Sequence, residues 1–181
     1  MDKPAFAEAY GRIVPAFAFR EQGGVGIYTL PAFSAYAEID HGFSARIGGV
    51  SQAPFTGLNL SFTNDRREDV LENYRRFAQG AGFPDASMVM DSYEHGITVR
   101  RVDRQDRGRG YTRESLPPCD GLITNDPEVT LITGHADCMA FYFFDPVKKA
   151  IGLCHAGWRG GARAHRRECD RPDEAGLRLR S

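Results

Sequence analysis

The sequence predicts a single globular domain in which several short strands combine with at least one helix. Three observations support this: short apolar runs alternate with glycine before residue 50, one segment has helical periodicity, and two apolar runs flank an Asp-Pro pair. The chain has 181 residues, 41% hydrophobic and 26% charged, which is an ordinary globular composition. This length is enough for one domain with a hydrophobic core.

Two strands are expected in the first part of the chain, at residues 24–30 and 35–39, because both are short and apolar. They lead into a glycine-rich turn at residues 41–51. The adjacent Gly48 and Gly49 allow a positive φ and a close approach of another backbone segment there.

The clearest helix is predicted over residues 65–79. Asn64 or Asp65 can cap its start and Gly80 can close its end. Residues 103–118 are polar and rich in arginine and glycine, so an exposed loop is expected there. The apolar face of the helix consists of Val70, Leu71, Tyr74, Phe77 and Ala78.

A β-hairpin is predicted from the apolar segments 138–144 and 150–155, joined by a type I turn at residues 145–148 that begins with Asp-Pro. In that register Cys138 faces His155, and directly opposed Cβ atoms lie roughly 5 Å apart. A loop longer or shorter by one residue would shift the register by one residue, so that Cys138 and His155 would no longer lie directly opposite each other.

A thiolate and a neutral imidazole are common zinc ligands, so Cys138 and His155 are candidate metal ligands. The alternative is that Cys138 is a small buried hydrophobic residue. A third ligand has to come from another segment, and His95, just before an expected strand at residues 97–99, can face the site.

The remaining histidines have weaker claims. His41 opens the glycine-rich turn and could cap it, and His165 lies near the end of the chain. His135 is expected to face the opposite side of its strand from the site, as a structural residue.

Composition argues against several classes of function. The net charge of −1 gives no basic field for nucleic acid or an anionic membrane. The longest apolar stretch, residues 139–144, is too short to span a bilayer, and the first residues do not resemble a secretory signal. The four cysteines do not have the spacing of a disulfide scaffold. A cytoplasmic protein is therefore expected, and the sequence carries no signal for an oligomeric state.

Five segments together resemble the laccase-domain (YfiH-like) family, also called multicopper polyphenol oxidoreductases. In the family's order and spacing, they are residues 41–51 (HGFSARIGGVS), 58–60 (LNL), 120–124 (DGLIT), 136–138 (ADC) and 155–160 (HAGWRG). The resemblance implies an α+β fold of mixed β-sheets flanked by helices. It also implies that one zinc ion is bound by His95, Cys138 and His155.

The resemblance implies the activity as well, namely phosphorolysis of adenosine, inosine and methylthioadenosine together with deamination of adenosine. The substrates would be a purine nucleoside and phosphate. The chain departs from the family pattern at Tyr93 and Glu94, where Gln-Val or Gln-Thr is usual, and at Ala140, where proline is frequent. Neither change removes a ligand, but Glu94 brings a carboxylate near the metal.

Three polar residues within the matching segments are candidates for substrate contacts. Arg46 could clamp phosphate through two parallel hydrogen bonds, or could pair with an acidic surface neighbour. Asn59 could bind a ribose hydroxyl or stabilise its own loop. Arg159 is a second phosphate candidate. Asp120 and Asp137 could orient the metal ligands.

The resemblance ends near residue 161. Residues 162–181 contain six arginines, four acidic residues and only two leucines, without strand or helix periodicity. We therefore expect an incomplete laccase domain at residues 1–161, followed by a non-homologous, disordered tail at 162–181 that reflects truncation or a frameshift.

The leading functional hypothesis is a metal-dependent purine nucleoside enzyme. A copper-dependent phenol oxidase is an alternative, although five histidines are too few for a true multicopper oxidase. A hydrolase with a Cys138–His155 dyad and an inactive remnant are further alternatives.

Overall fold

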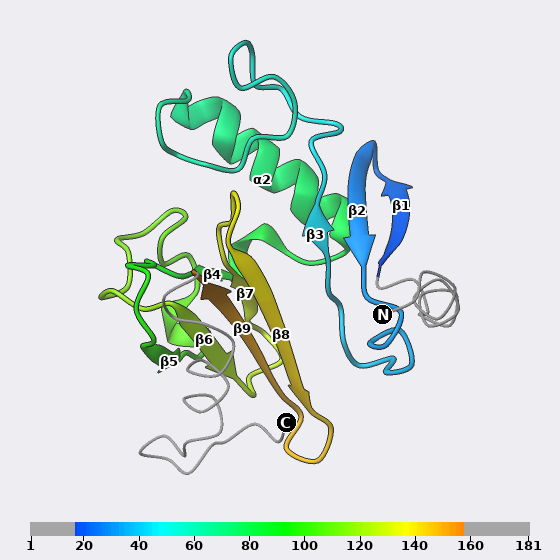
Figure 1. The fold of residues 1–181 in the computed structure, drawn as a ribbon, viewed down its shortest axis with the longest axis vertical. Coiled ribbons are helices and arrows are strands. Elements are labelled where there is room, and N and C mark those ends of the chain that lie inside the picture. The colour runs from blue at the N-terminus through cyan, green and yellow to red at the C-terminus, as the bar shows by residue number, and fades with distance from the viewer. Residues whose placement is uncertain (1–16, 158–181) are drawn as a thin grey trace, which may run out of the picture. The chain divides into compact units, whose positions relative to one another are not determined.

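The structure is a computed structural model, and it describes residues 17–157 (Figure 1). The chain divides into two compact units, Met1–Phe83 and Pro84–Ser181, and each is described by itself. No helix among residues 17–157 has the length and apolar character needed to cross a membrane.

The first unit contains a three-stranded antiparallel sheet in the order β1 (Ala18–Gln22), β2 (Val25–Thr29) and β3 (Phe43–Ser44). Strand β2 confirms the prediction for residues 24–30. The predicted strand at residues 35–39 is wrong. The backbone there forms turns, in which the N–H groups of Tyr36 and Ile39 bond to carbonyl groups three residues earlier instead of to a neighbouring strand.

The glycine-rich turn brings two backbone segments into contact, as predicted. Gly48 has a φ of 92°, and a Cβ atom on it would overlap the carbonyl group of Gly24. A Cβ atom on Gly49 would overlap the carbonyl group of Gly57. Any larger residue at either position would force these segments apart.

Helix α2 (Arg67–Ala81) covers one face of this sheet (Figure 1). Val70, Tyr74, Phe77 and Ala78 are buried, as predicted, whereas Leu71 is only half-buried. They contribute, with side chains from the sheet and the following loops, to the core of the unit. One cluster of that core consists of Val25, Ile27, Leu58, Phe77 and Ala81.

The predicted ends of the helix are wrong by two residues. The residue that closes the helix is Gly82, which adopts the left-handed conformation (φ 91°), and not Gly80, which lies inside the helix. Its N-cap residue is Arg66, without a side-chain cap. The Asp65 carboxylate, predicted to cap the helix, instead accepts hydrogen bonds from Ser51 and Asn59.

The second unit is built on a four-stranded mixed sheet. Its order is β5 (Val99–Arg101), β6 (Gly121–Thr124), β9 (Ala150–Ala156) and β8 (Met139–Asp145). Only the pair β5–β6 is parallel. A separate parallel pair joins β4 (Met88–Met90) to β7 (Thr130–Ile132). Mixed sheets together with a helix confirm the α+β fold class.

Irregular segments connect these strands. Two short 3-10 helices, η1 (Asp85–Ser87) and η2 (Arg104–Asp106), precede β4 and follow β5. The predicted loop at residues 103–118 is largely confirmed, but it is not exposed throughout. Tyr111 and Leu116 are buried, and Leu116 packs into the core that contains Leu122 and Val89.

The β8–β9 hairpin is confirmed, but its register differs from the prediction by two residues. Ala140, not Cys138, lies opposite His155, because Asp145 pairs with Ala150 and the loop is formed by residues 146–149 instead of 145–148. Two local features fix this position of the loop. Asp145 Oδ1 accepts the N–H groups of Val147 and Lys148, and Lys149 has a φ of 51°.

Candidate metal centre

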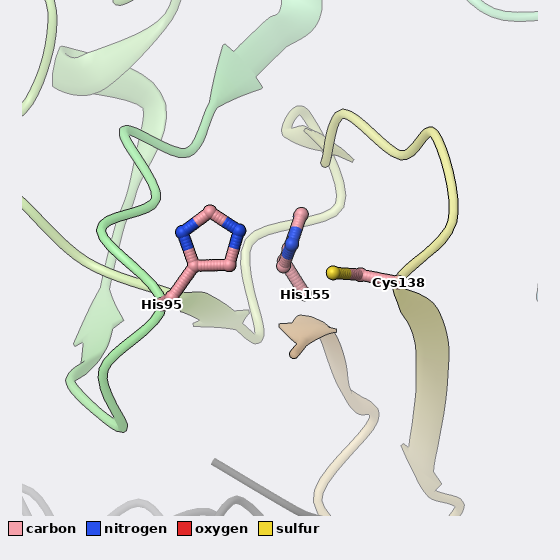
Figure 2. Close-up of side chains that lie close together, drawn as sticks. All are labelled: His95, Cys138 and His155. Atoms are coloured by element: carbon pink, nitrogen blue, oxygen red, sulfur yellow. The ribbon is translucent and has the colours of Figure 1, made fainter. Parts of the chain in front are cut away.

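Three side chains from separate segments converge in the second unit, as Figure 2 shows. His95 lies in the loop between β4 and β5, Cys138 immediately precedes β8, and His155 lies in β9. One potential ligand atom from each lies within 4.8 Å of the other two. These are the three metal ligands that the family resemblance implied.

His155 is positioned by both its backbone and its ring. Its N–H donates to the carbonyl oxygen of Asp120 at 2.7 Å, and its Nδ1 lies 2.6 Å from the carbonyl oxygen of Gly134. A carbonyl oxygen only accepts, so Nδ1 carries the proton and Nε2 has a free lone pair. Nε2 is buried and has no hydrogen-bond partner among the described residues. A buried nitrogen in this state fits a metal ligand.

The chain passes very close to His95 at Gly157. A Cβ atom on Gly157 would lie 3.1 Å from His95 Cδ2 and 3.8 Å from Cys138 Sγ. His95 itself is exposed and has a φ of 62°, which is unusual for a residue other than glycine. The space between His95 and Cys138 is thus kept open by the missing side chain at residue 157.

Burial and the neighbouring Asp137 raise the pKa of the Cys138 thiol. A cysteine nucleophile needs the opposite shift, so the geometry does not favour the Cys138–His155 hydrolase. A bound cation would instead lower the pKa of this thiol, because a coordinated thiol loses its proton. Cys138 is therefore better suited to binding a metal than to attacking a substrate.

Two other rings stack on the ring of His155. The Tyr93 ring stacks on it with a centroid distance of 4.2 Å and an interplanar angle of 14°. The His135 ring also stacks on it, with a centroid distance of 5.0 Å and an interplanar angle of 12°. The prediction that His135 faces away from the site is wrong, because residues 133–138 do not form a strand and the chain bends at residues 136–138. Burial lowers the pKa of His135 to about 4, which keeps this ring neutral near pH 7.

Asp120 connects the segments that carry two of the ligands. Its Oδ1 accepts the N–H group of Glu94, and its carbonyl oxygen accepts that of His155. Asp120 therefore holds the backbone of both segments, by its side chain at Glu94 and by its carbonyl group at His155, and its orienting role stays a prediction. Its fully buried Oδ2 has no hydrogen-bond partner within residues 17–157. Sequence reasoning missed Asp91, a half-buried residue whose Oδ2 is buried and whose pKa is raised by burial to about 7.

The candidate substrate residues lie elsewhere in the chain. In the first unit, Arg46 Nη2 donates to the carbonyl oxygens of Phe55 and Thr56, both at 2.7 Å. Asn59 donates to Asp65 at 2.8 Å and bonds within its own loop. Arg159 lies outside the described residues.

His41 bonds to the residue that follows β2. The Leu30 N–H donates to His41 Nε2 at 2.8 Å, and burial lowers the pKa of His41. His41 therefore stabilises the start of the glycine-rich turn, as the sequence suggested. His165 lies outside the described residues.

The donor set suits a divalent transition metal. Two imidazoles and one thiolate match the three protein ligands that catalytic zinc sites use, with a fourth position open for substrate or water. The unpartnered Nε2 of His155 and the open space at Gly157 fit a cation of that size.

Comparisons with known proteins identify relatives of this chain. The chain is 39% identical over 124 residues to "Purine nucleoside phosphorylase YlmD" of Geobacillus stearothermophilus, covering 67% of this chain and 45% of the relative. It is 36% identical over 157 residues to "Purine nucleoside phosphorylase LACC1" of Mus musculus, covering 84% of this chain and 33% of the relative. The matched region thus spans less than half of each of these relatives.

A solved structure supports the same relationship. The crystal structure of YlmD from Geobacillus stearothermophilus superimposes with a TM-score of 0.73 at 35% identity, covering 80% of this chain and 53% of that one. Residues 40–167 match the family described as multi-copper polyphenol oxidoreductase laccase. The chain therefore belongs to this laccase-domain family, whose curated members named above are purine nucleoside phosphorylases.

Proposed function

We propose that the protein acts as a metal-dependent purine nucleoside phosphorylase, with a metal ion bound by His95, Cys138 and His155. One observation carries the proposal: His155, whose buried Nε2 has no hydrogen-bond partner in the described part of the chain, offers a ligand atom within 4.8 Å of those of His95 and Cys138. The names of the related phosphorylases support the choice of reaction.

Zinc is the proposed metal, because a thiolate with two imidazoles and an open fourth position is a common catalytic zinc arrangement. Copper is the alternative, since the same donors bind Cu²⁺ more tightly. When bound, such an ion would supply Lewis acidity to a substrate atom.

In the proposed reaction, a phosphate oxygen forms a bond to the anomeric carbon C1′ of the nucleoside. The C1′–N9 bond breaks, its electron pair leaves with the purine, and the purine takes up a proton. Arg46 and Arg159 are proposed to bind phosphate, and Asn59 to bind the sugar. Guanidinium groups suit phosphate because they offer paired N–H donors and a permanent charge.

Adenosine, inosine and methylthioadenosine are the proposed nucleosides, and deamination of adenosine is a proposed second reaction. Location in the cytoplasm also remains a prediction. So does the assignment of residues 1–161 to the laccase domain and of 162–181 to a separate tail.

Purified chain loaded with zinc, incubated with inosine and phosphate, tests the proposal. Chromatography should detect hypoxanthine and ribose 1-phosphate in equal amounts, and no hypoxanthine when phosphate is omitted. Cys138→Ala should abolish both products. If the zinc-loaded chain forms neither product from inosine or adenosine, the proposed reaction is wrong.

Copper-dependent oxidation of a phenol is a second candidate, favoured by the family's description as a polyphenol oxidoreductase. The donor set would hold a single Cu²⁺ ion. Colour development with a phenolic dye that requires added copper and disappears in Cys138→Ala would support it. Equal colour in wild type and variant would exclude this site.

A further inference from the structure

We infer that Tyr93 and His135 are positioning residues that hold the His155 ring between them and thereby set the geometry of the metal site. The inference rests on the metal site proposed above. Neither residue offers a ligand in the His95–Cys138–His155 cluster. Their effect would operate through the ring that they contact.

The Tyr93 and His135 rings both stack on His155, and two parallel rings this close to one imidazole would overlap on a single face, so we infer that they contact opposite faces. Both are nearly parallel to it, at interplanar angles of 14° for Tyr93 and 12° for His135. A flat ring between two parallel rings cannot tilt without losing contact on one face. The remaining motion, rotation in the ring plane, would break the 2.6 Å hydrogen bond from Nδ1 to Gly134. Together these contacts fix the direction of the Nε2 lone pair.

Each stacking ring belongs to a segment that carries a different ligand. Tyr93 lies two residues before His95, and its ring also contacts His95 edge-on at 5.5 Å. His135 lies three residues before Cys138, and its Nε2 is 2.7 Å from Thr133 Oγ1. Contact with His155 therefore connects the His95 segment and the Cys138 segment through strand β9.

The stack has a direct consequence for binding. With the rings in place, the three ligand atoms lie close together before a cation arrives, so less ordering is needed on binding. Removing either ring frees His155 and one neighbouring ligand segment. Because the ligands themselves remain, metal binding should weaken but not disappear.

The experiment measures zinc affinity of the full chain by competition with a chromophoric chelator. Tyr93→Ala and His135→Ala should each weaken affinity by roughly 10- to 100-fold, the range known for residues that orient metal ligands. Tyr93→Phe and His135→Phe keep a flat ring and should stay within about threefold of wild type. Tyr28→Ala is the matched control, since Tyr28 is a similarly exposed tyrosine in the first unit whose ring contacts that of Phe19.

The absorption spectrum of the cobalt-substituted protein separates positioning from general destabilisation. Tetrahedral cobalt with a thiolate ligand absorbs strongly, so a loosened ligand set should reduce the visible bands in the alanine variants. The phenylalanine variants should recover them. Tyr93→Leu keeps apolar bulk without a flat ring, and it replaces Tyr93→Ala in this test if the alanine variant fails to fold.

The outcomes separate this inference from the proposed metal site. If wild type binds no zinc, the metal site itself is wrong. If wild type binds zinc, and Tyr93→Leu and His135→Ala match its affinity and its cobalt spectrum, the positioning role is overturned while the metal site stands.

Discussion

The Nδ1 atom of His155 lies 2.6 Å from the carbonyl oxygen of Gly134, and this contact determines which ring nitrogen can bind a metal. Gly134 precedes the Cys138 segment, so the hydrogen bond also ties β9 to that segment. The chemical behaviour expected of the site follows from this and a few neighbouring contacts.

Gly157→Ala should weaken zinc binding about tenfold or more, because its methyl group would lie 3.1 Å from His95 Cδ2 and push that ring away from Cys138. Gly134→Ala is a matched control. Its methyl group would meet Tyr93 at an ordinary 3.5 Å, and its carbonyl group is retained. Competition with a chelator measures the zinc affinity of both variants and checks this prediction. Equal affinities would show that the space at residue 157 does not matter.

Arg46→Ala should raise the KM for phosphate by at least about tenfold and change the KM for inosine much less, since a paired guanidinium contact is lost. Arg46→Lys should recover only part of the loss, because lysine lacks the planar fork. Arg75→Ala, an exposed arginine of α2, is the control. Thermal unfolding is measured alongside, because Arg46 also bonds to Phe55 and Thr56. An unchanged phosphate KM in an active Arg46→Ala variant would remove Arg46 from the proposed site.

Asp91 should make the folded state less stable as pH rises from about 4 to about 7. Its pKa is about 7 in the folded chain, against 3.8 without burial, so in this window only the folded state holds the proton. Stability should fall by roughly 1.4 kcal/mol per pH unit relative to Asp91→Asn. Urea unfolding at pH 4.5 and 7 tests this, with Asp40→Asn, an exposed position, as control. If the free energy of unfolding changed with pH equally in wild type and Asp91→Asn, this role of Asp91 would be refuted.

Asn73→Ala should destabilise the first unit by roughly 2–4 kcal/mol. The Asn73 side chain is fully buried, accepts the Val50 N–H at 2.8 Å and donates to Ser51 and to the Asn59 carbonyl. Its loss would leave buried polar groups of the glycine-rich turn without partners. Gln79→Ala, on the exposed side of the same helix, should cost less than about 0.5 kcal/mol. Similar losses in the two variants would contradict this reading of the contacts.

The β8–β9 hairpin shows how far the sequence alone could lead. The apolar runs and the Asp-Pro pair predicted the two strands, but not the left-handed Lys149, with which the loop spans residues 146–149 instead of 145–148. Because side chains alternate with a period of two, a two-residue error keeps every residue on its predicted face. Cys138 and His155 therefore still lie near each other, as diagonal and not direct neighbours.

The rings around His155 could not be predicted in the same way. Tyr93, His135 and His155 come from three segments, and their stacking depends on how those segments pack. The sequence showed Tyr93 only as a departure from the family pattern. For His135, the assumption of a regular strand placed the ring on the wrong side, since the chain bends there.

X-ray absorption at the zinc edge of the purified chain tests the metal site most directly. The expected result is one zinc per chain with one sulfur neighbour at about 2.3 Å and two imidazole nitrogens at about 2.0–2.1 Å. The sulfur neighbour should be missing in Cys138→Ala. A spectrum without sulfur in wild type, or protein that binds no zinc, would contradict a site formed by His95, Cys138 and His155.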